Sequence, residues 1–282
     1  MSDYILTISC PDTTGIVHSV TGWLLEKQGN IIEAEQFGDE LTQRFFLRIH
    51  FSIPKSSSAE QLRAEFSYIA DRYQMDAQIH DTKEKARVLL LVSRQGHCLN
   101  DLLFRTHSGQ LPINIVGVLS NHTDHAALAA TYQIPFHHLP VTPATKSEQE
   151  QQILQFVDDL EVDLVVLARY MQILSPEMCK ALSGRAINIH HSFLPSFKGA
   201  RPYHQAHARG VKIIGATAHY VTEDLDEGPI IEQDIERVSH DMSPTELTQV
   251  GSDVESLVLA RAVKAHVEHR IFLNGERTVV FK

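Results

Sequence analysis

The sequence has few cysteines and no long apolar run, and these two shortages exclude several classes of protein. Only Cys10, Cys98 and Cys179 occur among 282 residues. This odd, widely spaced set suits neither a disulfide framework nor a CxxC metal knuckle. No apolar stretch approaches the roughly 20 residues that a membrane helix needs, and Met1 to Cys10 lacks the basic start and apolar core of a secretory signal. We therefore expect a cytoplasmic protein with reduced thiols and no membrane partner.

Positive charge is also scarce, with 25 Lys and Arg residues against 35 Asp and Glu and a formal net charge of -10. Phosphate neutralisation needs a concentrated basic surface, so nucleic acid is not an expected partner. The 17 histidines include no HExxH motif. The pairs His137-His138 and His204/His207 also lack carboxylate or cysteine companions at a metal-binding spacing. We expect no metal site.

The chain length suits two domains, since domains commonly span roughly 100 to 200 residues. The first pattern begins with alternating apolar and polar residues, is broken at Pro11–Gly15, and continues at helical spacing. Its order predicts a ferredoxin-like βαββαβ arrangement. The expected elements are a strand at Tyr4–Ser9, a helix from Ile16, strands at Ile31–Phe37 and Arg44–Ile53, a helix at Ala59–Tyr73 and a strand at Met75–His80.

A charged hinge at Asp81–Arg87 precedes a second pattern, in which short apolar runs alternate with helical ones. Such runs suit strands that are buried on both faces of a mostly parallel, Rossmann-like α/β sheet. We place the domains at 1–83 and 84–282. The expected buried strands are Val88–Val92, Ile113–Leu119, Leu164–Ala168 and Ala186–Ile189; longer strands follow at Ile214–Val221 and Ile230–Val238, and Ser243–Phe272 contains a long helix begun by Ser243-Pro244.

The residues best suited to chemistry stand at the end of one expected strand and in a later acidic turn. Asn188 and His190 project to the same side of a strand because side chains alternate with period two. The run Ser192–Pro195 has the character of an exit loop at the carboxyl end of a strand, where ligands gather in open sheets. The turn Thr222–Pro229 carries four carboxylates between two strand-like runs. In isolation, Asn188 and His190 are more typical of a fraying strand end, and the acidic turn is more typical of a solvated loop.

Taken together, these features resemble a known signature. The segments Asn188-x-His190, Phe193-Leu194-Pro195, Gly215-x-Thr217-x-His219 and Asp226-x-Gly228-Pro229 are similar to the folate-dependent formyltransferase fold, as in glycinamide ribonucleotide transformylase. Pro11-Asp12-x-x-Gly15 and Gly29-Asn30-Ile31 resemble an ACT domain. The combination resembles the formyltetrahydrofolate deformylases over nearly the whole chain.

This resemblance implies an enzyme that hydrolyses 10-formyltetrahydrofolate with no cofactor, supplying formate for purine synthesis and balancing the one-carbon pools. It implies that Asn188, His190 and Asp226 are catalytic. It also implies glycine and methionine as effectors, and a homo-oligomer, a dimer or tetramer. The implied folate-binding residues are Met171, Gln172, Ile173, Leu174, Val221, Thr222, Glu223 and Asp224, and the implied effector-binding residues are Asp12, Gly15, Ile16, Asn30 and Ile31.

One segment departs from the transformylase pattern. Where the transformylase carries a glycine- and serine-rich turn that cradles a substrate phosphate, this sequence has the bulkier run Ser93–Leu99. The departure favours water over a phosphorylated acceptor. Two alternatives stay open: a formyltransferase that uses a small-molecule acceptor, and a non-catalytic amino-acid-binding regulator that retains an enzyme fold. For Met171, Ile173 and Leu174, an ordinary core role competes with folate binding.

Overall fold

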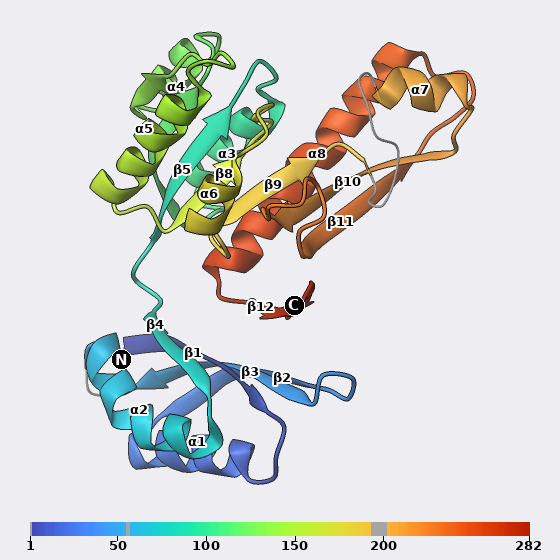
Figure 1. The fold of residues 1–282 in the computed structure, drawn as a ribbon. Coiled ribbons are helices and arrows are strands. Elements are labelled where there is room, and N and C mark those ends of the chain that lie inside the picture. The colour runs from blue at the N-terminus through green and yellow to red at the C-terminus, as the bar shows by residue number, and fades with distance from the viewer. Residues whose placement is uncertain (1, 55–56, 193–201) are drawn as a thin grey trace. The chain divides into compact units, whose positions relative to one another are not determined.

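A computed structural model describes residues 2–54, 57–192 and 202–282. The chain divides into two compact units, one made of Met1–Lys85 with Glu268–Lys282 and one of Ala86–Val267 (Figure 1). The three cysteines are free and buried. Among the described residues, no helix is long and apolar enough to cross a membrane.

The first unit has the predicted βαββαβ order and a four-stranded antiparallel sheet ordered β2-β3-β1-β4, which confirms the ferredoxin-like arrangement. The sheet is antiparallel because β1 pairs with both β3 and β4 in that sense, and β2 pairs with β3 in the same way. The elements are β1 (Ser2–Pro11), α1 (Ile16–Glu26), β2 (Asn30–Asp39), β3 (Arg44–Ile53), α2 (Ala59–Tyr73) and β4 (Asp76–Asp81).

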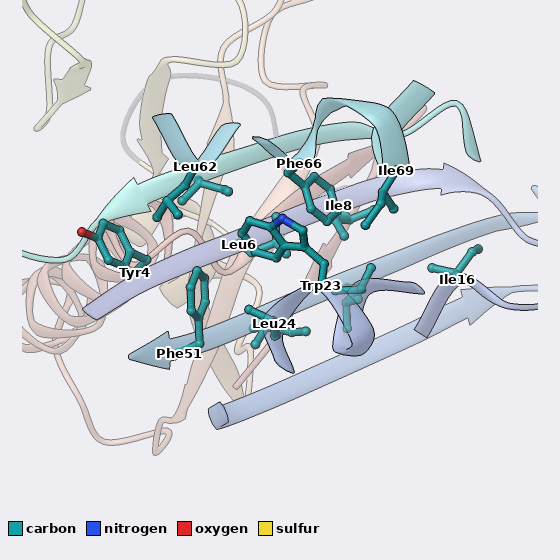
Figure 2. Close-up of a cluster of buried hydrophobic side chains, with 14 of the residues drawn as sticks. Tyr4, Leu6, Ile8, Ile16, Trp23, Leu24, Phe51, Leu62, Phe66 and Ile69 are labelled. Carbon is teal, nitrogen blue, oxygen red and sulfur yellow. The ribbon is translucent and has the colours of Figure 1, made fainter. Parts of the chain in front are cut away.

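The core of this unit lies between the sheet and its two helices, as Figure 2 shows. Trp23 from α1 meets Phe66 from α2 edge-to-face, with ring centroids 5.0 Å apart, and both rings are buried. Helix α2 starts where the sequence provides a capping box: Ser58 accepts from the Gln61 amide and the Gln61 side chain accepts from the Ser58 amide. Local signals and burial therefore agree on this fold.

The C-terminal residues depart from the expected domain division. We assigned residues 268–282 to the second domain, but they group with the first unit, where β12 (Ile271–Asn274) and β13 (Arg277–Val280) form a hairpin. Phe272 packs against Phe46 of β3, with ring centroids 5.7 Å apart. Asn274 also donates a 2.6 Å hydrogen bond to Asp39. The hairpin covers apolar rings on the sheet, which the sequence periodicity alone did not indicate.

The second unit is built on a seven-stranded sheet ordered β11-β10-β9-β8-β5-β6-β7. Strands β5 to β9 are parallel to one another. Strand β10 is antiparallel to both of its neighbours, β9 and β11. The strands are β5 (Ala86–Val92), β6 (Ile113–Ser120), β7 (Phe136–His138), β8 (Leu164–Leu167), β9 (Ala186–His190), β10 (Ile213–Tyr220) and β11 (Ile230–Arg237). The mostly parallel sheet is confirmed. Strand β7 was not expected because its three residues give no readable pattern.

Helices flank this sheet, because the central strands are apolar on both faces. Leu89 and Leu91 of β5 belong to a core with Ile153 and Val157 of α5, whereas α8 packs on β9, β10 and β11 and beside α3. The long helix expected within Ser243–Phe272 is confirmed as α8, which begins directly after Ser243 and ends at Val267. The helices are α3 (His97–His107), α4 (Ala126–Thr131), α5 (Lys146–Asp159), α6 (Pro176–Ala181), α7 (Pro202–Ala208) and α8 (Pro244–Val267).

The placement of the hairpin predicts the outcome of Phe272→Ala. Removing this buried ring should destabilise the first unit by about 3 kcal/mol, as truncation of a packed phenylalanine does. Hydrogen exchange should then rise at the amides of β3 and stay unchanged at those of β5. The neighbouring variant Leu273→Ala is the control, because its side chain is 48% exposed. Faster exchange in β5 rather than β3 would place the hairpin with the other unit.

Candidate active site

The candidate catalytic residues lie on two neighbouring strands and on the loop that follows the second. Asn188 and His190 point to the same side of β9, as the period-two pattern predicted. Strand β10 pairs with β9 in a register that sets His219 opposite Asn188 and Thr217 opposite His190. Thr217 donates a 3.0 Å hydrogen bond to the carbonyl of Ser192, directly beyond β9. The Gly215-x-Thr217-x-His219 segment thus holds the end of β9 in place.

The loop between β10 and β11 brings Asp226 to His190. The Asp226 Oδ2 atom lies 3.2 Å from His190 Nδ1, and Oδ1 lies 3.8 Å from His219 Nε2. Asp226 has a φ of 58°, a left-handed conformation that aspartate tolerates better than most residues. Burial opposes ionisation, but the hydrogen bond that Asp226 accepts from His190 outweighs it and holds the pKa of Asp226 well below its usual value. The carboxylate is therefore charged at neutral pH.

His190 presents one ring nitrogen to Asp226 and leaves the other for a ligand. Its Nδ1 faces the carboxylate, so Nδ1 carries a proton. Its Nε2 is buried and has no hydrogen-bond partner among the described residues. The ring of His191 stacks on His190 with centroids 4.7 Å apart, and burial lowers the pKa of His191 to about 4. His191 is thus a neutral neighbour of His190.

His219 orients the amide of Asn188. Its Nδ1 donates a 2.8 Å hydrogen bond to the carbonyl of Tyr220, so in the neutral ring Nε2 is an acceptor. The Nδ2 atom of Asn188 lies 3.3 Å from that Nε2. This contact uses one of the two amide protons of Asn188 and leaves the second for a ligand. His219 belongs to the quoted signature, but the sequence alone assigned it no role, because its position opposite Asn188 depends on strand register.

Gly228 lets the Asp226 loop approach β10 closely. A Cβ atom at this position would collide with the carbonyl oxygen of Tyr220, the same oxygen that accepts from His219. Only glycine fits there, which explains the Asp226-x-Gly228-Pro229 spacing in physical terms. The glycine is required for contact rather than for an unusual φ, since Gly228 is absent from the positive-φ glycines of the described chain.

A cavity of about 220 Å³ opens beside these residues. Met171 and Ile173 are 56% and 61% exposed, although both are apolar, whereas Leu174 packs against the core of the sheet. The segment therefore combines the two roles considered for it, with Leu174 in the core and the other two side chains at the cavity. The lining includes all three candidate catalytic residues and all eight expected folate-binding residues: Asn188, His190, Asp226, Met171, Gln172, Ile173, Leu174, Val221, Thr222, Glu223 and Asp224.

Two further residues, Ser93 and Arg169, fix the cavity wall. Ser93, at the end of β5, accepts a 3.0 Å hydrogen bond from the Met171 amide and donates a 2.8 Å bond to Asn121. Arg169 lines the cavity with a φ of 65° and donates to Gln95. The exposed Arg94 of the run Ser93–Leu99 is not among the residues that line this cavity.

The five expected effector residues lie in the first unit, on the turn before α1 and at the start of β2. Asp12, Gly15, Asn30 and Ile31 are exposed, and Gly15 adopts a left-handed φ of 93° at the N-cap of α1. The Ile16 side chain is buried in the core and is therefore not available to an effector. The expected exit Phe193-Leu194-Pro195 falls outside the described residues.

Comparisons with known proteins agree with this geometry. Residues 86–263 match the Formyl transferase family. The chain is 50% identical over 280 residues to the formyltetrahydrofolate deformylase of Corynebacterium sp. (strain P-1), covering 99% of this chain and 98% of that protein. A crystal structure of formyltetrahydrofolate deformylase from Burkholderia mallei superposes with a TM-score of 0.96 at 54% identity, covering 100% of both chains.

A more distant likeness covers less of the chain. The crystal structure of glycinamide ribonucleotide transformylase 1 from Symbiobacterium toebii gives a TM-score of 0.66 at 28% identity. It covers 70% of this chain and 95% of that one. The transformylase therefore matches a part of this chain, whereas the deformylases match it throughout.

The contact at Gly228 predicts a local effect of Gly228→Ala. The added methyl group must displace the loop from Tyr220, which should cost about 1–3 kcal/mol as overpacking does. The side-chain NMR signals of His190 and His219 should shift. Gly210→Ala is the control, because Gly210 has a φ of 61° but open space around it; it should lose stability without moving those signals. Unchanged histidine signals in Gly228→Ala would refute the proposed contact.

Proposed function

This chain belongs to the formyltetrahydrofolate deformylase family, and from that premise we propose that Asn188, His190 and Asp226 carry out its reaction. The reaction is the hydrolysis of 10-formyltetrahydrofolate to formate and tetrahydrofolate. The observation that supports this assignment is the convergence of the three side chains on one cavity, with the Nε2 atom of His190 unpaired. A formyltransferase with a small-molecule acceptor is not favoured by the full-length likeness to deformylases.

The first step is the attack of water on the formyl carbon, which turns the carbonyl oxygen into an oxyanion. The Nε2–H group of protonated His190 and the free amide proton of Asn188 are the donors for this oxygen. Both are held before the reaction begins, His190 by Asp226 and Asn188 by His219. Fixed donors stabilise developing charge without a cost of reorganisation.

The second requirement is the movement of protons. Asp226 accepts a proton from the attacking water, since its lowered pKa keeps it ionised and it borders the cavity. When the tetrahedral intermediate collapses, the C–N bond breaks and the N10 nitrogen departs with a proton delivered by the Asp226–His190 pair. One proton of the water thus ends on tetrahydrofolate, and the other is released with formate.

The exposed apolar side chains Met171 and Ile173 would contact the faces of the pterin ring. The backbone of Val221–Asp224 would bind the polar edge of the ring, as small-molecule pockets generally do.

Every step above is carried by a side chain of this protein, so we propose that no metal or cofactor takes part. We also propose that the formate supplies purine synthesis and balances the one-carbon pools.

The mechanism predicts formate release from 10-formyltetrahydrofolate without any acceptor. Asn188→Ala should lower kcat by about 10²- to 10³-fold, the usual loss for one oxyanion donor. Asp226→Asn and His190→Ala should lower it by about 10²- to 10⁴-fold through lost proton transfer. Glu227→Gln is the matched control, being an exposed carboxylate in the same loop. Strict dependence on an added acceptor would show a transferase, and normal turnover in His190→Ala would remove this mechanism.

We propose further that the first unit is an ACT domain that binds glycine and methionine and joins copies of the chain into a dimer or tetramer. Strand β2 is an edge strand, and its apolar residues Ile32 and Phe37 are 51% and 45% exposed. Exposed apolar edges are suited to pairing with another chain. Asp12 and Asn30 lie on the exposed turns where an amino-acid effector would bind.

Light scattering on the full chain should therefore give the mass of a dimer or tetramer. Phe37→Glu should shift the mass toward the monomer, because a charge on the paired edge opposes association. Leu41→Glu is the control, since Leu41 lies beyond β2 and is already 82% exposed. A monomeric wild type would exclude edge pairing.

The proposed effector site predicts a second result. Formate release should respond to glycine and methionine in the wild type and not in Asp12→Ala. An equal response in both would exclude Asp12 from the effector site.

A further inference from the structure

We propose that His191 holds the attacking water: a ring nitrogen of His191 accepts one hydrogen bond from this water while Asp226 accepts the other. The proposal rests on the hydrolytic function above and adds a further catalytic residue to it. Asn188, His190 and Asp226 account for the oxyanion and for the transferred proton. They leave open what aims the water at the formyl carbon.

The position of His191 is the first argument. Consecutive side chains of a strand point to opposite sides, so the residue after His190 would normally face away from the cavity. Strand β9 ends at His190, however, and the ring of His191 lies on that of His190, with centroids 4.7 Å apart and planes inclined by 22°. His191 also lines the cavity together with Asn188 and Asp226. The end of β9 thus brings two adjacent imidazoles to one cavity.

The ring of His191 has hydrogen-bonding capacity to spare. Among the described residues, its nitrogens take part in no hydrogen bond or ion pair. The other imidazole beside the catalytic set is engaged on both sides: Nδ1 of His219 donates to the carbonyl of Tyr220, and Nε2 faces the amide of Asn188. His191 therefore presents to the cavity a nitrogen that His219 cannot offer.

The charge state of His191 suits the acceptance of a hydrogen bond from water. Burial lowers its pKa to about 4, and the charges of Arg169 and His190 act in the same direction, against those of Glu255 and Asp226. A neutral imidazole has one N–H donor and one acceptor nitrogen, whereas a protonated imidazole has two donors and no acceptor. At neutral pH, His191 can thus accept a proton of the water in a hydrogen bond.

Two acceptors fix the orientation of the attacking water. With one hydrogen bonded to Asp226 and the other to His191, the water directs a lone pair at the formyl carbon. As the C–O bond forms, the carbonyl electron pair moves to the oxyanion, and Asp226 takes the first proton. The second proton stays on the new hydroxyl group, bonded to His191. After the C–N bond breaks, the first proton is on N10, and the second leaves with formic acid, which ionises to formate.

The stack on His190 would also allow a purely supporting role, in which His191 only fixes the ring of its neighbour. The two roles require different properties of the side chain, because a support needs a flat ring and a water site needs an acceptor atom. His191→Phe keeps the ring and removes the acceptor. His191→Asn and His191→Gln remove the ring and provide an acceptor at about the reach of Nδ1 and Nε2, respectively.

The experiment measures formate release from 10-formyltetrahydrofolate by the full chain, and the affinity of each variant for tetrahydrofolate. His191→Phe should lower kcat by about 10²-fold, the usual cost of a misplaced reactant, with KM and tetrahydrofolate affinity unchanged. His191→Asn or His191→Gln should be at least about tenfold faster than His191→Phe, because a side-chain oxygen again holds the water. His138→Phe is the matched control: it makes the same change at an exposed histidine outside the cavity and should keep the wild-type kcat.

Wild-type kcat in His191→Phe would overturn the proposal. It would also be overturned if His191→Asn and His191→Gln were both no faster than His191→Phe, since the ring rather than the nitrogen would then matter. If His191→Phe does not fold, His191→Leu removes the same acceptor and is compared with the two amide variants in the same way. Absent formate in the wild type would refute the hydrolytic function itself, whereas failure of this inference leaves wild-type formate release intact.

Discussion

The pairing of Asp226 with His190 is the constraint on which the rest of the site depends. The two residues come from different elements: His190 lies at the end of β9, and Asp226 lies in the loop beyond β10. Their side chains meet only if β10 lies in register beside β9. Gly228 makes this approach possible by admitting the Tyr220 carbonyl. One 3.2 Å contact thus depends on the glycine, on the strand register and on the left-handed backbone of Asp226.

Much of the fold could be predicted because its signals are local. The period-two pattern put Asn188 and His190 on one side of β9, and the capping box placed the start of α2. The contacts of His219 and Glu255 could not be read in this way. His219 depends on strand register, and Glu255 contacts His97, which lies 158 residues away from it in the sequence. The C-terminal hairpin was missed for the same reason, because Phe272 packs against Phe46, which is far from it in the sequence.

The central claim is that water, activated beside the Asp226–His190 pair, attacks the formyl carbon directly. The most direct measurement is a single turnover of 10-formyltetrahydrofolate in water enriched in the heavy oxygen isotope, followed by mass spectrometry of the formate. Our account predicts one heavy oxygen in each formate, from the attacking water, beside the original formyl oxygen. Formate without the heavy isotope would contradict the account, because its second oxygen would then have come from another donor.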